Sequence, residues 1–356
     1  MTNEAAWLKE PKANVEIAPA PMYTPGPGDV LVKVESIGFN SIDAKIQKWA
    51  YLVSPKLKSV ANALFRHSAL PIPYPAILGV SFAGVVEEVG PAVTSVQLGD
   101  RVVVSKCPGG GNSYSAFQKY ALARESFLAK LDRSTTFDDA SAAITNLATI
   151  VAALTIQMGL QRPPLSGKAE PNGKRVLIYG GSSSCGRYAT KYASDAGYEV
   201  VTTSSPGHRK TVEEHNPSYI IDHTLPHEKL ISELKSHGPY DAVFDAIGTP
   251  PVTAMLVAMF GEKGGSYHTT LPPMGDELIP TNVERTFASY TALLNKNENE
   301  DVRKWFFEQY VPKGLANGQI IPSSIIKKEN GLRSVQEVLD SILSITGKRF
   351  VVNPQN

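Results

Sequence analysis

Residues 175–186 read Arg-Val-Leu-Ile-Tyr-Gly-Gly-Ser-Ser-Ser-Cys-Gly. The apolar run 176–179 is typical of a central parallel strand that is covered on both faces. Small residues follow it, and residues 187–194 contain no proline or glycine, which favours a helix. A strand, a tight turn of small residues and a helix form the entry to a βαβ unit. The helix N-terminus of such a unit can hold a pyrophosphate, because its backbone N–H groups point at the ligand.

The glycine spacing of this turn departs from the G-x-G-x-x-G pattern. Gly180, Gly181 and Gly186 are present, but Ser183 and Ser184 stand where glycines are expected. A glycine-rich turn alone is weak evidence for a dinucleotide site. An ordinary strand-to-helix turn therefore remains an alternative reading of this segment.

A second apolar segment, residues 197–205, follows at the distance expected for the next strand of the unit. NAD-binding units usually end this strand with Asp or Glu, which bonds the ribose 2′-hydroxyl. Here the chain instead carries hydroxyl and basic side chains: Thr203, Ser204, Ser205, His208, Arg209 and Lys210. Hydroxyls and cations bind a 2′-phosphate that a carboxylate would repel, so the segment predicts NADPH rather than NADH. A solvated turn without a ligand is the alternative.

Composition places the 356-residue chain among ordinary globular proteins, with 42% hydrophobic and 19% charged residues. The net charge of +1 does not favour a nucleic-acid partner. The apolar stretch 140–160 is interrupted by polar residues and is expected to be a buried helix, not a membrane span. The N-terminal residues lack a secretory pattern, so we expect a cytoplasmic protein.

Two cysteines, Cys107 and Cys185, are too few for a disulfide framework or for a structural zinc site with about four Cys ligands. None of the seven histidines forms a ligand-spaced pair beside Cys107. We therefore expect no metal and a reducing compartment.

The organisation along the chain predicts two domains. Residues 1–130 contain several short strands bounded by Gly, Pro or Asp, which suggests a small β-barrel. From residue 176 strands alternate with helices, as in a doubly wound parallel sheet. The predicted fold class is α/β, with a β-barrel domain formed by residues 1–150 and 299–356 and a Rossmann domain formed by residues 151–298.

The whole chain resembles the zinc-independent branch of the medium-chain dehydrogenase/reductase superfamily. Within that branch it looks most like fungal trans-acting enoyl reductases of polyketide pathways and their quinone-oxidoreductase-like relatives. The landmarks that carry the resemblance are residues 38–45, 78–86, 99–102, 116–121, 175–186, 244–248 and 347–352. The resemblance implies a GroES-like β-barrel domain that is completed by the C-terminal segment, and an active site between this domain and the Rossmann domain.

Two segments depart from the zinc-binding members of the superfamily. Residues 38–40, Gly-Phe-Asn, stand where alcohol dehydrogenases place their first zinc-binding Cys. Residues 79–81, Gly-Val-Ser, stand where they have Gly-His-Glu. Ser81 also departs from zincless relatives, which usually carry Asp at this position.

The resemblance implies a set of cofactor-binding residues in the glycine turn, around the predicted 2′-phosphate site, at two later strand ends and in the last strand. They are Gly181, Ser182, Ser183, Ser184, Cys185, Gly186, Ser204, Ser205, His208, Arg209, His223, Ile247, Gly248, Thr269 and Phe350. An ordinary core position is the alternative for Phe350.

The resemblance also implies that Thr145, Asn146 and Thr149 line the substrate cleft, although polar residues on a buried helix more often bond the backbone. Tyr51 and Tyr114 are further cleft candidates. Lys45 matches a lysine near cofactor and substrate, and a surface lysine is its alternative. Lys45 and Asn40 are the catalytic candidates.

Without zinc, hydride addition to an activated C=C is less demanding than carbonyl chemistry. We expect hydride to reach the β-carbon of an α,β-unsaturated carbonyl or enoyl thioester. The resemblance implies a role in secondary metabolism, with a polyketide synthase as a candidate partner. Lys45, Asn40, backbone N–H groups or a ribose hydroxyl could stabilise the enolate oxygen. A tyrosine or water could protonate the α-carbon. The alternatives are a zinc-independent quinone or carbonyl reductase and a catalytically idle NADPH-binding partner of a synthase. Neither a nucleic acid nor a membrane is an expected partner.

Overall fold

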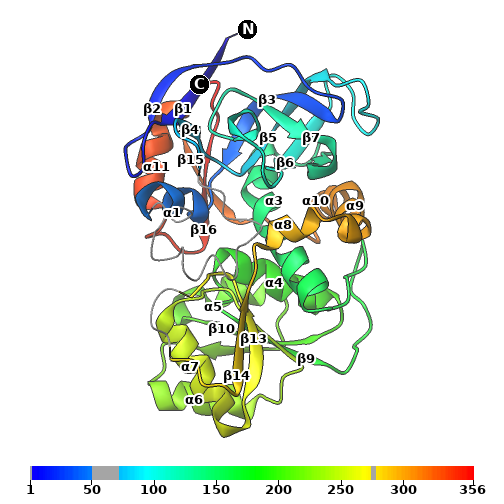
Figure 1. Cartoon of the computed structure of the whole chain (residues 1–356). Coiled ribbons are helices and arrows are strands. Elements are labelled where there is room, and N and C mark those ends of the chain that lie inside the picture. The colour runs from blue at the N-terminus through cyan, green and yellow to red at the C-terminus, as the bar shows by residue number, and fades with distance from the viewer. Residues whose placement is uncertain (1, 50–71, 274–277) are drawn as a thin grey trace. The chain divides into compact units, whose positions relative to one another are not determined.

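The structure is a computed structural model that describes residues 2–49, 72–273 and 278–356 (Figure 1). The chain divides into two compact units. The first comprises Met1–Ala148, Leu294–Gly318 and Pro322–Asn356, and the second comprises Thr149–Leu293 and Gln319–Ile321. The C-terminal segment therefore returns to the unit in which the chain begins.

The first unit is built on two sheets. Its larger sheet has the strand order β15-β16-β3-β5-β6-β8, with β7 also paired to β3, and its smaller sheet has the order β2-β1-β4. The central pair, β3 and β5, is antiparallel. The strands are β1 (Asn3–Leu8), β2 (Glu16–Ala20), β3 (Asp29–Gly38), β4 (Ala76–Ile77), β5 (Ser81–Val89), β6 (Arg101–Ser105), β7 (Tyr120–Arg124), β8 (Leu128–Lys130), β15 (Ser324–Lys328) and β16 (Lys348–Val352).

The first unit has a single large core between these sheets and its helices. Val32, Phe82 and Phe117 belong to it and are fully buried. The helices assigned to this unit are α1 (Ser41–Trp49), α3 (Phe137–Val151, whose last three residues belong to the second unit), α9 (Glu300–Lys304), α10 (Val311–Ala316) and α11 (Val335–Ser341).

A capping interaction stabilises the start of α3. Asp139 donates its backbone N–H to Thr136 Oγ1 at 3.0 Å, and that hydroxyl donates to Asp139 Oδ2 at 2.6 Å. The pair satisfies one N–H group of the first turn, as a capping box does.

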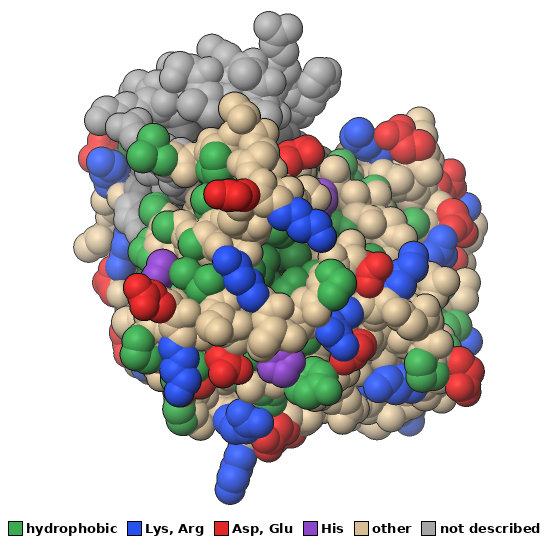
Figure 2. All heavy atoms as spheres, turned by 90° about the horizontal axis from the view of Figure 1, so that it is seen from below, with side chains coloured by type: hydrophobic (Ala, Val, Ile, Leu, Met, Phe, Trp, Pro, Cys, Tyr) green, Lys and Arg blue, Asp and Glu red, His purple; other side chains and the backbone are tan. Residues whose placement is uncertain are grey.

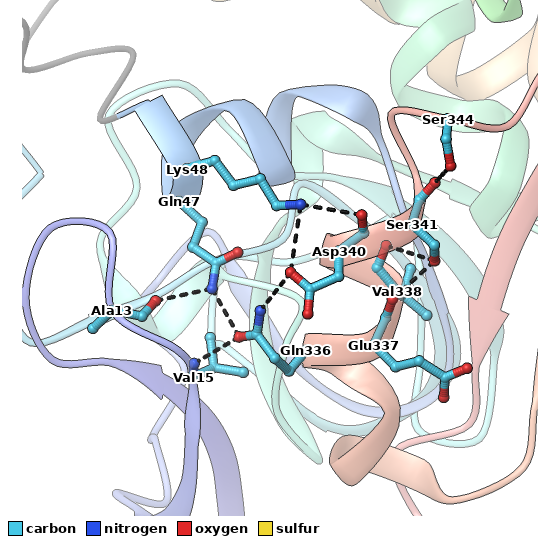
Figure 3. Close-up of polar contacts among 10 residues, drawn as sticks. All are labelled: Ala13, Val15, Gln47, Lys48, Gln336, Glu337, Val338, Asp340, Ser341 and Ser344. Atoms are coloured by element: carbon cyan, nitrogen blue, oxygen red, sulfur yellow. Dashed lines mark hydrogen bonds and ion pairs between the residues drawn. The ribbon is translucent and has the colours of Figure 1, made fainter.

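Helix α1 is held against α11 by a set of polar contacts (Figure 3). Gln47 Nε2 donates to Ala13 O at 2.9 Å and to Gln336 Oε1 at 2.8 Å. Lys48 Nζ donates to the backbone oxygen of Asp340 at 3.1 Å and lies 3.4 Å from its carboxylate. Gln47 is buried, so these contacts set the position of α1, which also carries Lys45.

The second unit is a six-stranded, all-parallel sheet with the order β11-β10-β9-β12-β13-β14. Numbered along the chain, this is the order 3-2-1-4-5-6 of dinucleotide-binding sheets. The strands are β9 (Arg175–Tyr179), β10 (Glu199–Ser204), β11 (Tyr219–Asp222), β12 (Ala242–Asp245), β13 (Gly265–Thr269) and β14 (Val283–Phe287). The helices are α4 (Ser184–Asp195), α5 (Arg209–Glu213), α6 (His227–Ser236), α7 (Pro250–Phe260) and α8 (Tyr290–Leu294, whose last residue belongs to the first unit).

The predicted fold class is confirmed, but strand β14 was not foreseen. Its sequence, Val-Glu-Arg-Thr-Phe, has charged residues at its second and third positions and only Val283 is buried. It lies at the edge of the sheet and pairs with one strand, β13, so its residues are less covered than those of a central strand. An edge strand of this kind lacks the apolar run by which the central strands were predicted.

The one described helix that is long and apolar enough to cross a membrane is Phe137–Gln157, and 72% of its most apolar window is buried within the protein. This burial is what a core helix shows. Acidic and basic side chains are interspersed over the described surface seen from below in Figure 2, without a large area of one sign.

Candidate functional site

The turn between β9 and α4 is a tightly packed nucleotide-type turn. Ser183 is the N-cap of α4, and its Oγ accepts the N–H of Gly186 at 3.0 Å. Gly180 and Gly181 donate their N–H groups to the hydroxyl and carbonyl oxygens of Thr203, at 2.8 and 2.9 Å. The turn is thus tied to β10. Ser182, Ser184 and Cys185 are half-buried at the start of the helix, where backbone N–H groups are available to an anion.

Glycine is required at three positions of this turn. Gly180 has φ +90°, a left-handed conformation, and a Cβ there would lie 2.6 Å from Ile247 Cγ1. A Cβ on Gly181 would lie 2.3 Å from Thr202 Oγ1, and one on Gly186 would lie 2.0 Å from the carbonyl oxygen of Gly180. The helix therefore packs against the strands as closely as the dinucleotide-binding fold demands.

The end of β10 carries the predicted 2′-phosphate residues. Ser204 is buried and donates to Ser205 O at 3.0 Å, whereas Ser205 and His208 are half-buried. Arg209 is exposed and already has partners, because Nε lies 3.0 Å from Glu213 Oε1 and a terminal nitrogen donates to Ile220 O at 3.2 Å. To reach a phosphate, Arg209 would have to leave these partners.

His223 is exposed immediately after β11. A carboxylate that sequence reasoning passed over, Asp222, is the register partner of Ser204. Its Oδ1 accepts the backbone N–H and the hydroxyl of Thr224, at 2.8 and 2.7 Å, and these bonds hold the pKa of Asp222 below its usual range. Asp222 is thus tied to its own turn beside the end of β10.

The carboxyl ends of β12 and β13 place Ile247, Gly248 and Thr269 together. Asp245 is fully buried, and its Oδ1 accepts the backbone N–H groups of Ile247 and Gly248 at 2.8 and 2.9 Å. Thr269 Oγ1 donates to the other carboxylate oxygen at 3.3 Å. Burial raises the pKa of Asp245, and these hydrogen bonds oppose the rise. Asp245 shapes this loop and was missed as a site residue, although its place at a strand end is a usable signal.

In the first unit, the two segments that replace the zinc-binding segments meet. Asn40 Nδ2 donates to Ser81 Oγ at 3.2 Å, and Ser81 Oγ donates to Thr145 Oγ1 at 2.6 Å. Asn146 Nδ2 donates to Asn40 Oδ1 at 2.9 Å, and Ser105 Oγ lies 3.1 Å from Thr145 Oγ1. We call these five residues the polar network. Sequence reasoning named three of them as site residues and missed Ser81 and Ser105 in that role.

Asn40 is a positioning residue in this arrangement. Besides Ser81, its Nδ2 donates to Gly38 O at 3.1 Å, so both amide hydrogens are used. Its backbone N–H donates to Asp43 Oδ2 at 2.8 Å. Asn40 consequently has no amide hydrogen left for an enolate oxygen, contrary to the role expected of it as a donor.

The remaining candidates lie in different surroundings. Lys45 is half-buried on α1, and Thr149 is half-buried one helical turn after Thr145 on α3. Phe350 is buried in the core of the first unit, with Lys328 Nζ 5.7 Å from its ring centre. Tyr51 lies outside the described residues.

Tyr114 is not part of the polar network. Its hydroxyl donates to Asp29 Oδ2 at 2.7 Å and accepts from Arg124 at 3.4 Å. Its ring packs on a separate small cluster with Leu31 and Leu122. Burial raises the pKa of Tyr114, and the bond to Asp29 raises it further. The structure thus places this phenol with Asp29 rather than with Asn40.

Sequence reasoning also missed Lys106, which follows β6. Its backbone N–H donates to Val80 O at 2.9 Å, and Val80 O also accepts Thr145 Oγ1 at 2.9 Å. Its Nζ donates to Ser115 Oγ at 2.7 Å. Lys106 therefore adjoins the polar network, and only the folded chain reveals it, because a lysine after a strand is common.

The described residues contain no group of three or more His, Cys, Asp or Glu side chains placed to hold a metal. The amide and hydroxyl groups of Asn40 and Ser81 are also poor zinc ligands compared with Cys and His.

Comparison with known proteins gives several matches. The family model "Alcohol dehydrogenase GroES-like domain" matches residues 26–133. Trans-enoyl reductase himH of Aspergillus japonicus is 31% identical over 371 residues, covering 99% of this chain and 97% of that protein. Dehydrogenase orsE of Emericella nidulans is 26% identical, covering 95% of each.

Solved structures share the fold along the whole chain. An alcohol dehydrogenase superfamily protein from Novosphingobium aromaticivorans matches with a TM-score of 0.77 and 21% identity, covering 99% of both chains. A mycobacterial protein solved in complex with NADPH matches with a TM-score of 0.73 and 20% identity, covering 99% of this chain and 100% of that one.

Proposed function

The chain belongs to the medium-chain dehydrogenase/reductase superfamily, and from this premise we propose that it is an NADPH-dependent enoyl reductase. Its substrates would be α,β-unsaturated carbonyls or enoyl thioesters, among them an enoyl chain carried by a polyketide synthase. The observation that carries the proposal is the relationship to a trans-enoyl reductase, which extends over nearly the whole chain.

The residues of the second unit fit a dinucleotide. The N-terminus of α4, with the half-buried residues Ser182, Ser184 and Cys185, would hold the pyrophosphate, since no side chain larger than cysteine stands there. Ser205 and His208 at the end of β10 would face the 2′-phosphate. Ile247, Gly248 and Thr269, held by Asp245, lie at the edge formed by the carboxyl ends of the strands, where this fold binds its ligands.

The chain's own contribution to catalysis would be positioning and charge. When bound, NADPH supplies the hydride. The polar network fixes Thr145 and Asn146, two of the cleft candidates of the first unit, through bonds of 2.6 and 2.9 Å. Helix α1 presents Lys45 from a position that its contacts with α11 hold in place. A rigid first unit of this kind lowers the entropic cost of aligning the substrate.

An NADPH-consumption screen tests this function. The purified protein is assayed with an enoyl thioester, an enone, a quinone and an aldehyde, and product masses are measured. We expect saturated products from the enoyl thioester and the enone, with little reaction of the aldehyde. Turnover of only the quinone or aldehyde would favour a quinone or carbonyl reductase. NADPH binding without turnover of any substrate would favour an idle binding partner.

A second arm of the same experiment concerns the metal. Because amide and hydroxyl groups replace the usual ligands, exhaustive chelation is expected to leave the rate unchanged. Loss of one tightly bound zinc together with activity would contradict this part of the proposal.

A further inference from the structure

We propose that Lys106 is the general acid that protonates the α-carbon of the substrate after hydride has reached the β-carbon. The inference rests on the proposed reductase function, for which the proton donor was left open between a tyrosine and water. It adds a catalytic residue that the resemblance does not supply.

The placement of Lys106 is the first support. Its N–H and the hydroxyl of Thr145 share one acceptor, Val80 O, at 2.9 Å each. The preceding residue, Ser105, contacts the same Thr145 hydroxyl at 3.1 Å. The backbone of Lys106 is therefore fixed beside the polar network, from which Thr145 and Asn146 are expected to face the substrate.

The surroundings of the ammonium group are the second support. Nζ donates to the hydroxyl of Ser115, a fully buried residue, at 2.7 Å. Asp43 is fully buried, and its Oδ1 has no hydrogen-bond partner among the residues that the structure describes. A buried carboxylate and a half-buried amine thus lie close enough to influence each other, and the thiol of the adjoining Cys107 is the other titratable neighbour.

These surroundings suit proton release near neutral pH. Burial lowers the pKa of Lys106 to about 8, while the neighbouring Cys107 and, to a smaller extent, Asp43 oppose the shift. An acid with a pKa near the working pH both gives up and regains a proton readily. Burial raises the pKa of Asp43 to about 7, while the backbone N–H of Asn40 and the positive charges of Lys106 and Arg349 oppose the rise.

Among the described residues, the tyrosine candidate Tyr114 is a less suitable proton donor. The phenol of Tyr114 is bonded to Asp29, and the carboxylate raises the pKa of that phenol further above its usual value.

The step balances without a further reactant. Hydride addition leaves an enolate, and its electron pair forms the new C–H bond at the α-carbon with a proton from Lys106. The N–H bond of the ammonium breaks and leaves a neutral amine. Because the side chain is only half-buried, water can return the proton before the next turnover.

The test uses an α-methyl enoyl thioester with the full-length protein in D₂O, where the configuration and deuterium content of the α-carbon report on protonation. Wild type is expected to place deuterium on one face. In Lys106→Met, we expect both faces to be labelled and turnover to fall on the order of a hundredfold, with the β-carbon configuration unchanged. Lys106→Arg should not restore selectivity, because a guanidinium does not release its proton.

Lys130→Met is the matched control, since Lys130 is an exposed lysine paired with Asp100 at 2.7 Å, and it should match wild type. Unchanged selectivity and rate in Lys106→Met would overturn the inference, as would full rescue by arginine, which would indicate a purely electrostatic role. Absence of turnover in the wild type would instead refute the proposed function.

A second readout needs neither cofactor nor turnover. The rate at which an amine-selective reagent acylates Lys106 in the cofactor-free protein, followed by mass spectrometry against pH, should have its midpoint near pH 8. A midpoint above about pH 10, the ordinary range for lysine, would overturn the inference.

Discussion

Replacing Gly181 with alanine tests how closely the nucleotide turn packs on β10. The new Cβ would lie 2.3 Å from Thr202 Oγ1 and 3.1 Å from its Cγ2. Thr202 is fully buried and its hydroxyl donates to Ile178 O at 2.7 Å, so rotation away from the new methyl group breaks a buried hydrogen bond. Overpacking costs about 1–3 kcal/mol and the lost bond about 1 kcal/mol. We expect Gly181→Ala to lower the free energy of unfolding by about 2–4 kcal/mol and to weaken NADPH binding.

A second substitution separates this side-chain collision from a general effect of alanine. Thr202→Ala removes both the Oγ1 and the Cγ2 atoms and leaves only its Cβ, 3.2 Å from the new methyl group. In that background Gly181→Ala should cost at least ~1 kcal/mol less, a coupling of the size seen between residues in contact. Gly186→Ala is the matched comparison, because its Cβ would meet the backbone oxygen of Gly180 at 2.0 Å. Thr202→Ala should not rescue it.

Urea unfolding of the single and double variants gives the four free energies of each cycle, and fluorescence titration gives the NADPH dissociation constants. A cost of Gly181→Ala that is equal in both backgrounds would refute the packing argument. Equal rescue of Gly186→Ala by Thr202→Ala would also refute it, because removing the Thr202 side chain cannot relieve a collision with the backbone oxygen of Gly180.

Three further changes test the cofactor site, the first unit and the pH response. Combining Ser205→Ala with Arg209→Ala should raise the NADPH dissociation constant by about ten- to a hundredfold and barely change that of NADH. The reason is that Arg209 can exchange its exposed ion pair with Glu213 for a contact with the 2′-phosphate. Equal affinities of the wild type for both cofactors would contradict this. Lys45→Met should raise the Michaelis constant for NADPH more than it lowers turnover. Steady-state kinetics with NADPH and deuterated NADPH measure both effects, and unchanged constants would remove Lys45 from the site. Burial lowers the pKa of His215 from 6.5 to about 3. Between these two pH values the imidazole is protonated in the unfolded chain but neutral in the native protein. Stability should fall as the pH drops from 6.5 towards 3, by on the order of a few kcal/mol, and His215→Leu should flatten this decline in urea titrations.

The parts of the fold that the sequence revealed were those with strong local patterns. The apolar run before Gly180, the small residues after it and the helix that follows predicted β9, its turn and α4 within a few residues. Central strands are covered on both faces, so their sequence is almost uniformly apolar. The charged edge strand β14 has no such pattern and was found only in the structure.

The polar network could not have been predicted from spacing. Ser81 and Thr145 are 64 positions apart, and Ser105 and Thr145 are 40 positions apart. Serines and threonines are frequent, and nothing local distinguishes those that meet. Asn40, Thr145 and Asn146 entered the candidate site through a family resemblance, and the resemblance gave no sign that Asn40 has both its amide hydrogens engaged.

Arg209 shows a related limit at the cofactor site. A sequence displays the charge of a side chain but not its partners, and the basic cluster after β10 therefore suggested a ready phosphate ligand. In the structure the guanidinium bonds Glu213 and Ile220 O, and Asp222 stands beside the end of β10. An exposed ion pair is worth at most about 1 kcal/mol, so a phosphate can displace Glu213.

The same reasoning applies to the segments that replace the zinc ligands. Residues 38–40 and 79–81 still converge, and Asn40 donates a hydrogen bond to Ser81. The hydroxyl and amide groups of the polar network hydrogen-bond to one another. They therefore orient neighbouring groups but carry no positive charge of their own. Positive charge that stabilises an anionic reaction intermediate must then come from cationic side chains next to the polar network. Lys106 adjoins the network directly, and α1, which begins next to Asn40, carries Lys45. Separate effects of these two lysines, one on α-carbon protonation and one on NADPH binding, would show how positioning and charge are divided in the first unit.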